Sequence, residues 1–202
     1  MGLFSWIYPD EYLDSAYDID YEKFYEDGFR GVIFDIDNTL VPQDAPSDER
    51  SDALLRRLKD IGYQVMLLSN NKEPRVKMFL ETMKERCEEE QDRDDIDSGD
   101  GVESDNAGES TESGIKIEYI HKAGKPSRKG YRKAMEQMGT NTGNTLFVGD
   151  QLFTDVWGAR RTGIYSILVK PMDPHEEIQI VIKRKIEKPF LAGYLKQRKG
   201  KK

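Results

Sequence analysis

The chain has 202 residues, of which 37% are hydrophobic and 34% charged, and this length is sufficient for one domain with a sizeable core. No run of about 18 apolar residues occurs and the N-terminus lacks the pattern of a secretory leader, so we expect neither a membrane-spanning helix nor a secreted protein. A single cysteine, Cys87, excludes an internal disulfide and, without other ligands, a zinc site, and it fits a cytoplasmic setting.

Charge is distributed unevenly along the chain. The net charge is −7, but residues 85–114 hold thirteen acidic and two basic residues and alone carry −11, so the other 172 residues carry +4. Apolar residues are too few in this segment to offset the entropy lost on ordering, so we expect a disordered acidic insert. Residues 183–202 hold nine basic residues and one acid and predict a basic C-terminal tail. We expect a single domain over 1–202 that carries both segments.

Strand-like and helix-like segments alternate along the chain. Runs of β-branched and aromatic residues predict strands at 31–35, 64–69, 115–120, 145–149 and 165–169. Helical spacing predicts helices at about 47–61, 73–87, 127–138, 153–162 and 175–187. Ser47 is expected to begin the first helix and Gly163 to end the fourth. This alternation is typical of the α/β class, so we predict a Rossmann-like three-layer sandwich around a mainly parallel sheet of five strands.

The residues after the predicted strands carry the chemistry. Ligands of a parallel sheet bind at the carboxyl ends of its strands. Oxygen-bearing side chains and one lysine follow four of the strands: Asp35, Asp37, Thr39, Ser69, Asn70, Lys125, Asp150 and Asp155. Clustered carboxylates repel one another unless a cation lies among them, and an oxygen-only ligand set favours Mg²⁺. Such a site suits phosphoryl transfer, in which one carboxylate attacks phosphorus and a second exchanges a proton with the leaving oxygen.

The order of these residues resembles the four motifs of the haloacid dehalogenase (HAD) phosphatase superfamily. The finer resemblance is to the YqeG-type branch of HAD subfamily IIIA, and it is carried by residues 34–42, 67–76, 123–139 and 149–171. This branch is similar to mitochondrial phosphatases that remove the terminal phosphate of phosphatidylglycerophosphate. The gaps between the motifs leave no room for a folded cap domain, so the resemblance implies a capless HAD fold with an open site.

The resemblance also implies catalytic and metal-binding roles. Asp35 is the expected nucleophile and a Mg²⁺ ligand. Asp37 is the expected general acid and base, with its backbone carbonyl on the metal, and Lys125 stabilises negative charge. Asp150 binds the metal, and Asp155 supports it directly or through water.

Three further residues are expected to bind the substrate. Ser69 holds phosphoryl oxygens, Asn70 contacts the phosphate, and Thr39 orients the loop after the first strand.

Several of these residues have a plainer interpretation. Asp155 lies near a helix start, where an acid is favoured in any case. Lys122 and Lys129 are neighbouring alternatives to Lys125. Arg75 could reach a phosphate or a lipid headgroup, but we expect it on a solvated helix face.

The resemblance implies a Mg²⁺-dependent phosphomonoester hydrolase with an aspartyl-phosphate intermediate, acting on phosphatidylglycerophosphate in the cytoplasm or peripherally at the inner face of the membrane. The basic tail and the aromatic residues Phe4, Trp6, Tyr8 and Tyr12 could contact that membrane, or these side chains could pack on the domain. Two other functions stay open: a capless phosphatase of phosphoproteins or other macromolecular phosphates, and a binding module that holds a basic partner. No nucleic-acid platform is evident, so no nucleic-acid partner is expected.

Overall fold

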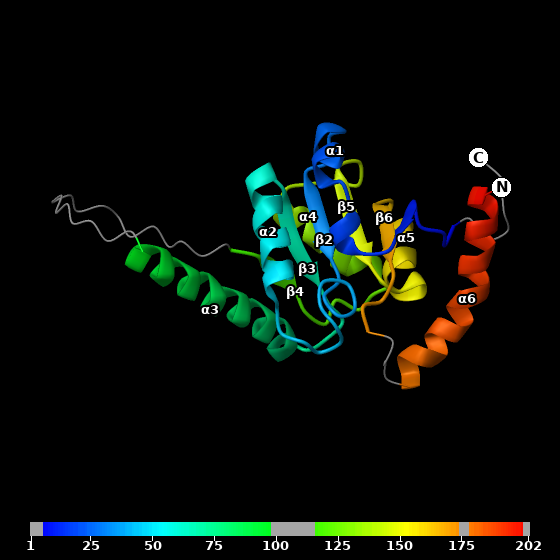
Figure 1. Ribbon diagram of the computed structural model, residues 1–202. Coiled ribbons are helices and arrows are strands. Elements are labelled where there is room, and N and C mark those ends of the chain that lie inside the picture. The colour runs from blue at the N-terminus through cyan, green and yellow to red at the C-terminus, as the bar shows by residue number, and fades with distance from the viewer. Residues whose placement is uncertain (1–5, 98–115, 174–177, 200–202) are drawn as a thin grey trace.

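A parallel sheet of six strands forms the centre of the molecule (Figure 1), in the order β1-β6-β5-β2-β3-β4. The computed structural model describes residues 6–97, 116–173 and 178–199. The predicted α/β class and parallel sheet are confirmed. The strands are β1 (Glu11–Leu13), β2 (Gly31–Phe34), β3 (Gln64–Leu68), β4 (Glu118–Ile120), β5 (Thr145–Gly149) and β6 (Tyr165–Val169).

The sixth strand, β1, corrects the predicted count of five. It pairs in parallel with β6 at the edge of the sheet, with Tyr12 opposite Leu168. Three residues are too few to display the alternation that marks a strand in a sequence. The pairing with β6 therefore decides its conformation.

The helices connect these strands on both faces of the sheet. They are α1 (Tyr21–Glu26), α2 (Glu49–Ile61), α3 (Glu73–Asp97), α4 (Arg128–Met138), α5 (Trp157–Thr162) and α6 (Ile178–Lys199), with shorter helical turns η1 (Ala16–Asp18) and η2 (Leu152–Val156). The cap of α2 is Asp48 rather than the predicted Ser47: its carboxylate accepts from the Ser51 backbone N–H at 2.7 Å, and the Ser51 hydroxyl accepts from the Asp48 N–H. Gly163 ends α5 as predicted, with a φ of 90°.

Alternate residues of the central strands face two cores. Val32 and Phe34 of β2 belong to a cluster that α2 and α3 cover, whereas Ile33 belongs to a second cluster on the side of α4 and α5. All three side chains are fully buried. Burial on both faces is what a parallel sheet requires, and it yields the predicted three-layer sandwich.

Helix α3 corrects part of the predicted disordered insert, because residues 85–97 are helical. Arg86 donates from Nε to the buried carboxylate of Asp52 on α2 at 2.8 Å, and Cys87 packs against the first core. These contacts anchor the first turns of the acidic segment. Figure 1 shows α3 projecting away from the sheet. Residues 98–114 of the insert lie outside the described part of the chain.

Helix α6 runs through most of the predicted basic tail and continues to Lys199. Tyr194 is buried, and Phe190 and Leu191 pack with it against Ile7 near the N-terminus. These apolar contacts were not predicted, because basic residues dominate the composition of 183–202. Residues 200–202 lie outside the described part of the chain, as does the start of the predicted helix at 175–177.

The N-terminal aromatic residues divide between packing and exposure. Tyr8 is buried against Tyr194 and Tyr12 is half-buried beside it, as the packing alternative expects. Trp6 is 52% exposed, with one edge on Trp157. Phe4 lies outside the described residues. Among those residues, no helix combines the length and the apolar character needed to cross a membrane.

Candidate active site

The predicted site residues meet at the carboxyl ends of the central strands. Asp35 follows β2, Ser69 follows β3 and Asp150 follows β5, and backbone bonds extend the ladders past the strand ends: the Asp35 N–H donates to Val148 at 2.9 Å, and the Ser69 N–H to Ile120 at 3.0 Å. Parallel neighbours end at one edge, so residues far apart in sequence share one site.

Lys125 is the centre of this cluster. Its Nζ lies 2.8 Å from Asp35 Oδ1 and 2.8 Å from Asp155 Oδ1, and only 2% of its side chain is exposed. Lys122 and Lys129, the two alternatives, are both exposed. The structure therefore brings the expected lysine to the expected aspartate.

Burial and mutual contact shift the pKa values of this pair. Burial raises the pKa of the Asp35 carboxyl from 3.8 to about 7, although Lys125 acts to lower it. Burial acts to lower the pKa of Lys125, but Asp155 and Asp35 outweigh it and hold that pKa above its usual value. Lys125 thus stays a cation, and Asp35 ionises readily only when further positive charge is near.

Asn70 holds the backbone of Lys125 in place. The Lys125 N–H donates to Asn70 Oδ1 at 2.7 Å, and Asn70 Nδ2 donates to the Lys125 carbonyl at 3.1 Å. We expected this amide to contact the phosphate, whereas here it positions the lysine. Its contact with a substrate stays a prediction.

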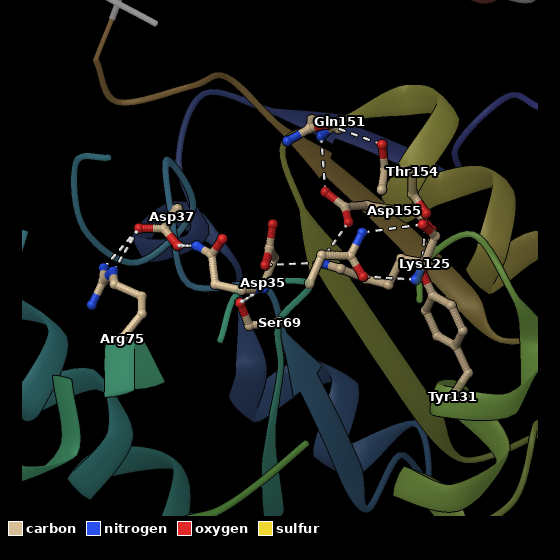
Figure 2. A network of polar contacts seen from close by, with 11 residues as sticks. Asp35, Asp37, Ser69, Arg75, Lys125, Tyr131, Gln151, Thr154 and Asp155 are labelled. Atoms are coloured by element: carbon tan, nitrogen blue, oxygen red, sulfur yellow. Dashed lines mark hydrogen bonds and ion pairs between the residues drawn. The ribbon is translucent and has the colours of Figure 1, made fainter. Parts of the chain in front are cut away.

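Asp155 lies on the π-helical turn η2 and is fully buried. Its Oδ2 accepts from the Gln151 N–H at 3.0 Å, so it caps the turn while Oδ1 pairs with Lys125. Gly149 makes room for this carboxylate, because a Cβ there would lie 2.7 Å from Asp155 Oδ2. The Tyr131 hydroxyl donates to the Asp155 carbonyl at 3.0 Å and fixes the turn from below (Figure 2). Asp155 therefore caps the turn and also belongs to the carboxylate cluster, and its support of a metal stays a prediction.

Three carboxylates offer a place for a cation. Asp35, Asp150 and Asp155 each present an oxygen within 4.8 Å of the others, and all three are buried. One lysine cannot balance three buried carboxylates, and oxygen ligands alone suit a hard divalent ion such as Mg²⁺. The residues present thus fit the expected metal. The side chain of Asp37 lies outside this cluster, which is compatible with its expected contribution of a backbone carbonyl.

Asp37 instead points toward α3. Figure 2 shows it reaching to Arg75 on one side of Asp35, with Lys125 and Asp155 on the other. Arg75 Nη2 lies 2.7 Å from Asp37 Oδ1, and its side chain is only 9% exposed. The expected solvated position of Arg75 is therefore wrong, because the pairing draws the guanidinium inward.

The other two predicted substrate-binding residues differ in position. Ser69 is buried, and its Oγ accepts from the Asn71 N–H at 3.0 Å, a contact in which the hydroxyl hydrogen takes no part. Thr39 is buried in the loop after β2, and its hydroxyl has no hydrogen-bond partner among the described residues. Thr39 does not line the hollow described next.

A hollow of about 130 Å³ opens at this edge of the sheet. At ~30 Å³ per water molecule this volume has room for a phosphoryl group. Sequence reasoning missed four residues that line the hollow: Gln43, Asn71, Gln151 and Thr154. Their sequence positions could have indicated three of them, because Gln151 and Thr154 lie between the predicted metal ligands Asp150 and Asp155, and Asn71 follows Asn70. The lining consists of Asp35, Asp37, Gln43, Ser69, Asn70, Asn71, Lys125, Gln151 and Thr154.

Several known proteins are similar to this chain in sequence or in structure. A family model described as HAD-hydrolase-like matches residues 122–171. A probable phosphatase, YqeG of Bacillus subtilis (strain 168), is 31% identical over 193 residues, covering 95% of this chain and 92% of that protein. Phosphatidylglycerophosphate phosphatase 1, chloroplastic/mitochondrial, of Arabidopsis thaliana is 30% identical over 89% of this chain, which spans only 45% of that protein. Among solved structures, NagD from E. coli K-12 superposes with a TM-score of 0.45 at 16% identity, over 76% of this chain and 91% of NagD.

Proposed function

Because the chain belongs to the family of the probable phosphatase YqeG, within the HAD-type phosphatases, we propose that it is a Mg²⁺-dependent phosphomonoester hydrolase that works through an aspartyl phosphate. The observation that carries this proposal is the buried cluster of Asp35, Lys125 and Asp155 beside a hollow of phosphoryl size. A bound Mg²⁺, held by Asp35, Asp150, Asp155 and the Asp37 carbonyl, would neutralise charge on the phosphoryl oxygens.

The residues then divide the reaction between them. The Asp35 carboxylate attacks phosphorus, the bond from phosphorus to the ester oxygen breaks, and the leaving oxygen takes a proton from Asp37. Water next attacks the phosphorus of the aspartyl phosphate, gives a proton to Asp37, and releases inorganic phosphate and the free Asp35 carboxylate. Lys125 and the Ser69 hydroxyl donate to the phosphoryl oxygens throughout.

The substrate we propose is phosphatidylglycerophosphate, which gives phosphatidylglycerol on losing its terminal phosphate. Two observations support this choice. One relative carries that activity in its name, and the hollow of about 130 Å³ has room for a phosphoryl group, so the rest of a bulky substrate would lie outside it. A peripheral contact with the lipid surface belongs to the same proposal.

The test is phosphate release from phosphatidylglycerophosphate in mixed micelles, with and without Mg²⁺, alongside p-nitrophenyl phosphate. We expect Asp35→Asn to lower turnover by about 10³-fold or more, because it removes the nucleophile. EDTA should abolish turnover as well. Asp27→Asn, which changes an exposed aspartate paired with Lys23, is the matched control and should retain activity.

The outcomes separate the chemistry from the substrate. Lipid turnover far above that of the aryl phosphate would support the whole proposal. Metal-dependent aryl hydrolysis with an inert lipid would contradict the lipid substrate and point to a macromolecular phosphate. No hydrolysis of either compound would contradict the phosphatase proposal.

A further inference from the structure

Arg75, on the first turn of α3, is a charged residue whose side chain is buried beside the site. Its Nε and Nη2 lie 3.1 Å and 2.7 Å from Asp37 Oδ1, and the two side chains are only 9% and 10% exposed. Asp44 lies further out, with its carboxylate 3.7 Å from Arg75 Nε and 63% of its side chain exposed. The contact between Arg75 and Asp37 is therefore close, charged and shielded from water.

Other donors complete the coordination of the Asp37 carboxylate. Asn71 Nδ2 donates to its Oδ2 at 2.7 Å, and the Asp44 N–H donates to its Oδ1 at 2.9 Å. With Arg75, donors from three separate segments reach both oxygens. The carboxylate thus has one defined orientation (Figure 2), and Asp37 lines the same hollow as Asp35.

Stability alone does not account for this arrangement. Burying an ion pair costs solvation energy that the attraction between its charges often fails to repay. Here the cost is higher, because Arg75 Nη1 is buried without a hydrogen-bond partner among the described residues. What the pair does supply is a fixed direction for Asp37, and catalysis is sensitive to placement of a reacting group within about 1 Å.

We propose that Arg75 is a positioning residue that acts through Asp37, holding its carboxyl group where it meets the leaving oxygen of the substrate. This inference rests on the proposed function, in which Asp37 exchanges a proton with that oxygen. The inference has a specific consequence. Loss of Arg75 should lower kcat most for substrates whose leaving group departs slowly unless it is protonated.

The test compares Arg75→Met with wild type on aryl phosphates of different leaving groups. On phenyl phosphate, whose leaving group is poor, we expect kcat to fall by about 10- to 100-fold. On p-nitrophenyl phosphate, whose leaving group departs without help, the fall should be less than about 3-fold. Lys77→Met, which removes a cation with a 51% exposed side chain on the same helix, is the matched control and should change neither rate.

Two further variants separate positioning from a structural role. Arg75→Lys keeps the charge without the two-pronged contact, and it should fold and show an intermediate dependence on the leaving group. Adding Arg75→Met to Asp37→Asn should cost nothing beyond Asp37→Asn itself, because the first residue acts through the second.

Equal losses on both substrates, or additive effects in the double variant, would overturn the assignment of Arg75 and leave the phosphatase proposal intact. A wild-type protein that hydrolyses neither substrate would overturn the proposed function, and this inference with it.

Discussion

At the scale of single residues, the site is a balance of buried charge. Lys125 contacts two carboxylates, and a third, Asp150, lies within reach of the same position. The cluster is short of positive charge: burial is the main cause that raises the pKa of Asp35 to about 7, and the neighbouring Asp155 carboxylate adds to the rise. A divalent cation would remove the shortage. The stability of the fold, the affinity for the metal and the protonation of Asp35 should therefore depend on one another.

We predict that the stability of the metal-free protein depends on pH through Asp35. The folded carboxyl keeps its proton to about pH 7, whereas the unfolded one loses it near pH 4, so the folded state binds more protons between these values. The free energy of unfolding should therefore fall from pH 5 to pH 8 in wild type, and fall less in Asp35→Asn. Urea denaturation in EDTA measures both.

Added Mg²⁺ provides the complementary measurement. It should raise the free energy of unfolding of wild type more at pH 8, where Asp35 ionises, than at pH 5. Parallel pH curves for wild type and Asp35→Asn would contradict the raised pKa.

At the scale of elements, helix α3 continues past the part of its sequence that has regularly spaced apolar residues, and contacts with the rest of the domain stabilise this extension. Its sequence beyond Cys87 is acidic and lacks a regular apolar stripe, so composition predicted disorder. Arg86 reaches back to α2, donating to Asp52 and to the Ser47 hydroxyl at 2.8 Å each. The first turn of the helix, with Arg75, thus lies at the candidate site, and the helix is anchored again three turns later.

We predict that Arg86→Met lowers the free energy of unfolding by about 1–3 kcal/mol, because it leaves the buried carboxylate of Asp52 without its cation. Lys84→Met, which breaks an exposed pair with Glu88, should cost less than about 0.5 kcal/mol. Urea denaturation compares the two variants. Hydrogen exchange should show faster exchange over 85–97 in Arg86→Met alone, and equal behaviour of both variants would argue against the anchor.

At the scale of the whole molecule, α6 brings the C-terminal part of the chain into contact with the turn η2 beside the site. Glu187 is buried and accepts from the Phe153 N–H at 3.0 Å, and Phe190 stacks edge-on against Phe153 at 5.3 Å. Phe153 belongs to η2, the turn that carries Asp155. Figure 1 shows α6 at the opposite end of the sheet from α3, so two long helices flank the domain.

We predict that Glu187→Met lowers the free energy of unfolding by about 1–3 kcal/mol, because the Phe153 N–H loses a buried acceptor. Because Asp155 lies on the same turn, the variant should also need more Mg²⁺ for half of its thermal stabilisation. Lys188→Met, at an exposed neighbouring position, is the control. An unchanged Mg²⁺ requirement in a destabilised Glu187→Met would show that α6 supports the fold without supporting the metal site.

The sequence by itself determined the class of the fold and most of the residues that meet at the carboxyl edge of its sheet. Strand composition and helical spacing are local properties, so β2, β3, β5 and β6 and the residues that follow them could be predicted from short stretches. Only the tertiary structure decided the sixth strand, the lengths of α3 and α6, and the partners of Arg75. Each of these depends on contacts between distant parts of the chain, such as Arg75 with Asp37, 38 residues apart, or β1 with β6. A buried ion pair or a three-residue edge strand leaves no periodic signal, because its stability comes from the partner that folding brings to it.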